Sequence, residues 1–264
     1  MSRIRFNDEG FAGQSIPALN TIQRDRFPDL FALADQCSSV AMDVSRLFGT
    51  QMNRRTLTMK LYFCRSVSHY QASVSLAAGG MAIESMVLTR GLFETVFVMT
   101  AIANDKVTLD ELSSTDFAGK NKQAKTLFQD MKRYPGIEVH SELLKKFTTD
   151  HADAKAVDLH EFARRGDVLL AYDGVYRALS HTVAHPSLSA VDVYLTDEGD
   201  GRHSLEYRPI VEQTPQAVLS ACSGILLACS SVERIGTRSP ATNTAIGHGL
   251  AEMERLDTKY EPWK

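Results

Sequence analysis

The chain has 264 residues, of which 44% are hydrophobic and 23% are charged, and its formal net charge is −3. A chain of this length and composition can bury a sizeable core and is typical of a soluble globular protein. The charge balance excludes the global electrostatic footprint of a basic nucleic-acid-binding protein or of a protein that coats anionic membranes.

The first part of the chain is predicted to be a polar lead-in followed by three helices. Residues 1–27 are polar, and we expect them to be weakly structured. Apolar residues at three- and four-residue spacing then predict amphipathic helices over 29–48 and 52–78, and Gly79-Gly80 ends the second one. The next helix, over 80–104, is apolar around nearly its whole circumference, which predicts that it is buried.

The middle of the chain is more polar but still helical in pattern. Residues 105–134 are predicted to form an outer helix or a helix-loop-helix, and 138–165 a further helical region. Asp167 is the expected N-cap of a further helix, because its carboxylate can accept a bond from a free backbone N–H. That helix should end at about His185, since Pro186 disfavours helical geometry at the residue before it.

One strand pair and two helices complete the predicted fold. Apolar and polar residues alternate over 191–195 and again over 203–210, with a turn-rich segment between them. Helices are then predicted over 215–235 and 242–260. The predicted fold class is therefore mainly α: a multi-helix bundle with one β-hairpin inserted near residues 190–210, forming a single domain over residues 28–264.

Neither secretion nor membrane insertion is expected. Residues 213–232 carry no charge and are long enough to span a bilayer, but glutamines, a proline and several serines interrupt the apolar run. A buried helix is the better interpretation. The N-terminus has no apolar core of the signal-peptide kind, and the four cysteines form no C-x-x-C pair. We therefore expect a cytoplasmic protein with no cofactor and no membrane partner.

A charged pair lies in the middle of the apolar helix. Arg90 and Glu94 are four residues apart and share a helix face. Desolvating such a pair is costly unless it is well partnered, so another segment should face it. Arginine before glutamate is the weaker helix pairing, which leaves Arg90 free to reach another helix or a ligand. The alternative is a structural ion pair that fixes helix register.

The best partner for this pair is the helix over 176–186. Arg177, Ser180 and His181 fall on one broad face, and His185 lies at the C-terminal end, where a helix favours a cation. A protonated histidine beside an arginine suits a phosphate or a carboxylate, and a neutral histidine can take or give a proton. We predict one polar pocket that gathers the candidate catalytic residues Arg90, Glu94, Arg177, His181 and His185 with the candidate substrate-binding residues Tyr176 and Ser180.

Two other kinds of chemistry fit the same residues less well. His181 and His185 have the spacing that can hold a transition metal, but they would need a carboxylate such as Glu94 or Asp173, and no carboxylate-histidine repeat is present. We therefore expect no metal. Ser180 as a nucleophile lacks the glycine pattern of a nucleophile elbow.

The run Arg90-Gly91-Leu92-Phe93-Glu94 and the later Tyr176, Leu179-Ser180 and His185-Pro186 resemble a bacterial family of unknown function. Its signatures are R-x-L-x-E and Y-x-x-L-S-x-x-x-H-P, and this chain has one residue more between the serine and the histidine. That family is distantly similar to the HEPN group of prokaryotic defence and toxin proteins. The resemblance implies an α-helical bundle and a homodimer.

In active HEPN ribonucleases an arginine and a histidine separated by four to six residues on one helix cleave RNA without a metal. Here Arg177 is too close to His181 for that spacing and too far from His185. The resemblance implies an RNA-processing or phage-defence/toxin effector that acts on RNA or a nucleotide, as a metal-independent ribonuclease if it is an enzyme. The alternative is a non-catalytic ligand- or partner-binding bundle whose polar cluster is structural.

Overall fold

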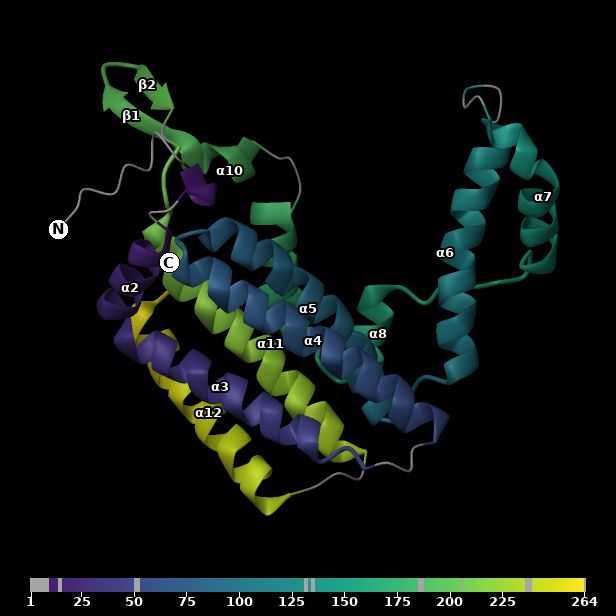
Figure 1. Cartoon of the computed structure of the whole chain (residues 1–264), viewed down its shortest axis with the longest axis horizontal. Helices are drawn as coiled ribbons and strands as arrows, with labels where there is room; N and C mark the ends of the chain where they lie inside the picture. Colours follow the sequence, from purple (N-terminus) through teal and green to yellow (C-terminus); the bar gives the residue numbers. More distant parts are fainter. Residues whose placement is uncertain are drawn as a thin grey trace.

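A computed structural model describes residues 10–13, 16–49, 53–130, 133, 136–184, 188–205, 207–235 and 239–263. Within these ranges the protein is mainly α-helical and has one two-stranded antiparallel hairpin, which confirms the predicted fold class (Figure 1).

Five long helices form the bundle and its core: α3 (Pro28–Arg46), α4 (Arg54–Ala78), α5 (Ala82–Ala103), α11 (Thr214–Arg234) and α12 (Pro240–Tyr260). Helix α5 packs on both α4 and α11, and α3 and α12 cover the outer side of α11 (Figure 1). Their predicted positions are confirmed to within a few residues. Pro28 and Pro240 each occupy the first helical turn, where the missing N–H costs nothing, and Asn53 caps α4 by accepting a bond from the Thr56 N–H.

Helices α5 and α11 approach each other closely at Gly224. A Cβ at this position would lie 2.7 Å from Leu92 Cδ2, so a larger residue would have to displace a fully buried leucine. Both helices are buried along most of their length, as predicted for 80–104 and 213–232.

Two helices, Ala82–Ala103 and Val211–Arg234, are long and apolar enough to cross a membrane. Their most apolar windows are 67% and 78% buried inside the protein. Core helices of soluble proteins have the same property, so length and composition give only weak support for a membrane span.

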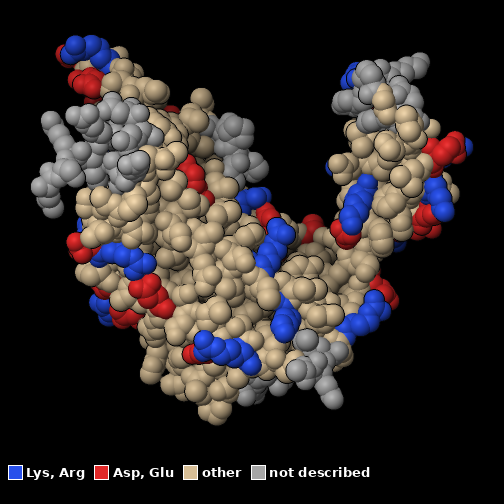
Figure 2. Space-filling model, in the orientation of Figure 1, with Lys and Arg blue, Asp and Glu red and all other residues tan. Residues whose placement is uncertain are grey.

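An arm of two helices stands away from the bundle. It consists of α6 (Leu109–Gln129) and α7 (Ser141–Asp150), and α8 (Leu159–Arg165) returns the chain to α5. Figure 2 shows an open cleft between this arm and the rest of the molecule. The helical region predicted over 138–165 is interrupted in the structure. Residues 151–158 are not helical and separate α7 from α8.

Two local predictions are corrected by the structure. The expected weakly structured lead-in contains α2 (Ile16–Arg26), which the buried Gln23 joins to Thr214 of α11 through a 3.0 Å hydrogen bond. Asp167 is not an N-cap: with φ of 58° it ends α8 in the left-handed region. Aspartate tolerates that region better than most residues do.

The hairpin lies within the predicted range of residues 190–210, but its two strands are closer together in the chain than predicted. Its strands are β1 (Leu195–Gly199) and β2 (Arg202–Leu205), with Leu195 opposite Leu205. The predicted strand 191–195 is mostly helical, formed by α10 (Leu188–Val191) and a 3-10 turn over Asp192–Tyr194. An apolar run this short does not distinguish a strand from a helical turn. The tight turn comes at Asp200-Gly201, where both φ angles are positive.

Substitution of Gly224 tests the close approach of α5 and α11. Gly224→Ala is expected to lower the free energy of unfolding by about 1–3 kcal/mol, because the added methyl group overpacks the contact with Leu92. The matched control is Gly247→Ala in α12, where nothing lies within 4 Å of the added Cβ. That change should raise stability by about 0.5–1 kcal/mol through helix propensity. Urea denaturation measures both, and equal effects would contradict the close approach.

Candidate functional site

The segment over 169–184, called here the site helix, alternates α- and π-helical turns. The π-turns are Ala171–Tyr176 and Ser180–Ala184, and α9 (Arg177–Leu179) lies between them. In an α-helix each residue advances by about 100°, so side chains four residues apart differ in direction by about 40°. A π-turn contains more residues than an α-turn, and the alternation of the two averages roughly four residues per turn. Side chains four residues apart therefore point in nearly the same direction. Two straight rows result: Tyr172, Tyr176 and Ser180 in one row, and Asp173, Arg177 and His181 in the other.

Arg90 joins α5 to the site helix. Its Nε donates to Ser180 Oγ at 2.9 Å, and its Nη2 donates to Tyr176 Oη at 3.1 Å. Its Nη1 lies 2.9 Å from Glu94 Oε1, and Tyr176 Oη donates to the same carboxylate oxygen at 3.2 Å. The predicted meeting of these two distant segments is thus present in the structure.

The Arg90–Glu94 pair lies at the edge of the core and is not fully buried. The Arg90 side chain is 27% exposed and that of Glu94 is 34% exposed. The fully buried ring of Phe97 packs edge-on against Tyr176 beneath them, with ring centroids 5.5 Å apart. Burial, and then the charge of Glu94, raises the pKa of the Tyr176 hydroxyl. That hydroxyl therefore stays a proton donor at neutral pH.

An open pocket of about 720 Å³ lies over this network. It is lined by Arg90, Tyr172, Asp173, Tyr176, Arg177, Ala178, Ser180 and His181. Tyr172 and Tyr176 stack with ring centroids 5.1 Å apart, and Arg177 lies 3.5 Å from Asp173 in a mostly exposed pair. Cationic groups and an aromatic shelf therefore face one space.

Six of the seven candidate site residues of the sequence analysis come together here. Five of them line the pocket, and Glu94 holds Arg90 from below: the five are Arg90, Tyr176, Arg177, Ser180 and His181. His185 lies outside the described residues, and so does Pro186. The metal site considered for His181 and His185 is therefore not described. Among the residues that the structure describes, no group of three or more histidine, cysteine, aspartate or glutamate side chains could hold a metal ion.

His69, a histidine of α4 beside this network, was not among the predicted site residues. A Cβ at Gly91 would lie 3.3 Å from its Cε1, so glycine next to Arg90 is what lets the ring pack against α5. Burial, followed by the positive charge of Arg65, lowers the pKa of His69, and the Gly91 backbone and Glu94 act weakly in the opposite direction. The one sequence signal was Gly91, the only glycine of α5, which lies next to the charged pair.

Comparison with known proteins gives a family but no function. A family model described as a family of unknown function (DUF5677) matches residues 58–203, more than half of the chain. The matched region contains both Arg90 and the site helix. No curated protein and no solved structure shows a significant match.

Replacement of Arg90 tests whether the network behaves as a buried ion pair. Arg90→Met is expected to cost about 1–2 kcal/mol in stability, because Met keeps the packing on Tyr176 and the partly exposed Glu94 keeps its bond from Tyr176. Arg255→Met is the matched control, since Arg255 forms a more exposed pair with Glu252 at 2.7 Å and should cost at most about 1 kcal/mol. Chemical denaturation measures both. A loss above about 3 kcal/mol for Arg90→Met would identify a fully desolvated pair instead.

The pKa of His69 predicts a weak acid sensitivity. Because folding lowers this pKa below its unfolded value of about 6.5, the contribution of His69 to stability is complete above that pH and declines as pH falls below it. NMR titration should place the His69 midpoint below about 6.5. In Glu94→Gln the midpoint should fall further, since the carboxylate favours the protonated ring. A midpoint at or above the reference value would contradict this environment.

Proposed function

The chain belongs to the DUF5677 family, and from its site we propose that it binds RNA in the pocket over Arg90 and cleaves it without a metal. The observation that carries this proposal is that Arg177 and His181, although closer in sequence than the HEPN pair, both line a pocket that two stacked tyrosines also line.

The pocket offers both kinds of contact that single-stranded RNA needs. Arg177 is mostly exposed, and its 3.5 Å pair with Asp173 is of the kind that contributes little in water. A phosphate that accepts two N–H bonds from a guanidinium is a stronger partner and can replace the carboxylate. The Tyr172–Tyr176 shelf lies beside it and suits an unstacked base.

The chemistry requires only groups that this helix carries. The His181 imidazole accepts the proton of a ribose 2′-hydroxyl, and the 2′-oxygen attacks the adjacent phosphorus. The bond between the 2′-oxygen and phosphorus forms, and the bond from phosphorus to the 5′-oxygen breaks. The departing 5′-oxygen takes a proton from a solvent water, and the His181 imidazolium returns its proton to solvent. Arg177 stabilises the charge that develops on the phosphate. The products are a 2′,3′-cyclic phosphate and a free 5′-hydroxyl.

A net charge of −3 limits the kind of RNA that fits. Long duplexes bind through many phosphate contacts, which need a surplus of cations. The proposal is therefore confined to a short single-stranded segment. The distant likeness to HEPN proteins supports an extended form, in which the chain is a cytoplasmic, homodimeric effector of phage defence or a toxin.

A second candidate is a non-catalytic bundle that binds a ligand or a partner. It is favoured by the fact that every nitrogen of the Arg90 guanidinium group has a partner within the protein. In this form Arg90 serves only to dock the site helix, and the pocket binds without turnover.

Cleavage of a labelled single-stranded RNA in the presence of a chelator separates the two candidates. The wild type should cleave, and His181→Ala and Arg177→Ala should each reduce the rate about 100-fold or more. The matched controls are His203→Ala and Arg202→Ala on β2, both exposed and outside the pocket. Both should cleave like the wild type.

Two results would overturn the catalytic proposal. One is intact RNA at a large excess of protein over a range of pH. The other is cleavage that the two site variants leave unchanged. Fluorescence anisotropy titration with the same RNA then tests the second candidate. If the pocket binds RNA without cleaving it, the wild type should bind the RNA and Arg177→Ala should bind it more weakly.

A further inference from the structure

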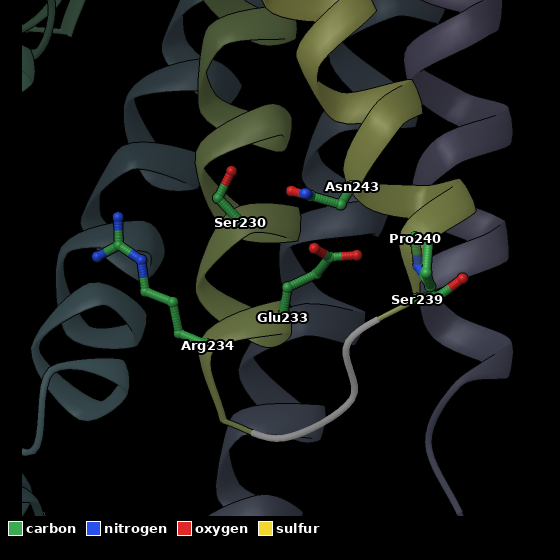
Figure 3. Close-up of a pocket in the computed structure, with 6 residues that line it drawn as sticks. All are labelled: Ser230, Glu233, Arg234, Ser239, Pro240 and Asn243. Carbon is green, nitrogen blue, oxygen red and sulfur yellow. The ribbon is translucent and has the colours of Figure 1, made fainter.

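A second pocket lies where α11 ends and α12 begins. Its volume is about 570 Å³, and it is lined by Ser230, Glu233, Arg234, Ser239, Pro240 and Asn243 (Figure 3). None of these residues lines the pocket over Arg90. The size falls in the range that small-molecule sites occupy, roughly 300–1,000 Å³.

The unusual residue of this pocket is Glu233. It is only 6% exposed, and its carboxylate points into the space between α11 and α12 (Figure 3). Thr242 Oγ1 donates to its Oε1. Among the described residues Glu233 makes no ion pair with any Lys, Arg or His. Burying a carboxylate is costly unless a positive charge or several hydrogen bonds compensate it.

The neighbouring arginine does not supply that charge. Arg234 points away from Glu233 in Figure 3, and its Nη1 donates to Asn104 Oδ1 of α5 at 3.0 Å. The guanidinium group is therefore held on the other side of α11. Within the described residues, no cationic side chain therefore compensates the Glu233 carboxylate.

The other polar groups of the pocket present acceptors. Ser230 Oγ donates its only proton to the Leu226 carbonyl at 2.9 Å, which leaves its lone pairs for a donor in the pocket. Thr242 Oγ1 has one proton and lies within reach of two acceptors, Glu233 and the Ser239 carbonyl at 3.1 Å. The Asn243 side chain points toward Ser230 and adds an amide oxygen (Figure 3).

We propose that this pocket binds the primary ammonium group of a small organic amine. An ammonium has three N–H donors and one positive charge, which match the free Oε2 of Glu233, the Ser230 hydroxyl and the Asn243 amide oxygen. A guanidinium fits less well, because its planar fork needs both carboxylate oxygens and Thr242 already binds one. A metal ion fits less well, because Glu233 is the only carboxylate that lines the pocket among the described residues. This site is independent of the proposed RNA pocket.

The test is calorimetric titration of the full chain with putrescine, using tetramethylammonium and potassium chloride as cations without N–H donors. Putrescine should bind saturably, and the other two should not. Glu233→Gln should weaken putrescine binding at least tenfold, which is the loss expected for one charge-assisted hydrogen bond. The matched control is Glu254→Gln, the same change at an exposed position of α12, which should bind like the wild type.

Three results would overturn the proposal: no saturable putrescine binding up to roughly 10 mM, equal binding of all three cations, or undiminished binding by folded Glu233→Gln. If Glu233→Gln does not fold, Asn243→Leu replaces it as the test. Asn243 is exposed, and its substitution removes only one acceptor from the pocket. That variant should bind about 2- to 10-fold more weakly, and unchanged binding would also overturn the site.

Discussion

One guanidinium group holds together two parts of the chain that are 86 to 90 residues apart. Arg90 bonds to Ser180 and Tyr176 of the site helix and to Glu94 of its own helix. Packing on α4, α11 and α8 covers the apolar sides of α5, so a charged residue in its middle is tolerated only where the site helix supplies polar partners. The pocket over Arg90 follows from this docking. Arg90, Tyr176 and Ser180 line the pocket together with residues of the site helix that do not bond to Arg90.

The sequence predicted the features that follow from one strong physical constraint, namely the partners of the charged pair and the long helices. A charged pair in an otherwise apolar helix needs partners, and the segment richest in polar residues of the right kind supplied them: Tyr176 and Ser180 both bond to Arg90. The long helices were predicted for a similar reason, since a periodic apolar pattern over twenty residues has few other interpretations. Requirements that concern only a few residues were less informative. Asp167 has the side chain of an N-cap but lies at a helix end, and the alternating run over 191–195 also satisfies a helical turn.

Other features depend on tertiary contacts, and no local pattern reports them. His69 is separated from Arg90 by a helix break and reaches α5 only because Gly91 leaves room for its ring. Glu233 follows an apolar run and precedes Arg234, so its sequence context is that of solvated charges at a helix end. In the structure the two side chains diverge, and the carboxylate is the buried one (Figure 3). The two pockets therefore differ in how charge is compensated. The one over Arg90 balances each arginine with a carboxylate, whereas the one beside Glu233 leaves a carboxylate without a counter-ion among the described residues.

The π-turns of the site helix make the pocket depend on how this segment winds, and not only on which side chains it carries. In a regular α-helix each residue advances by about 100°, so residues eight apart differ in direction by about 80°. With that winding Tyr172 and Ser180 would point to different sides. A change that restored regular α-helical winding would thus separate the tyrosine shelf from the hydroxyl that binds Arg90, although every functional side chain is retained.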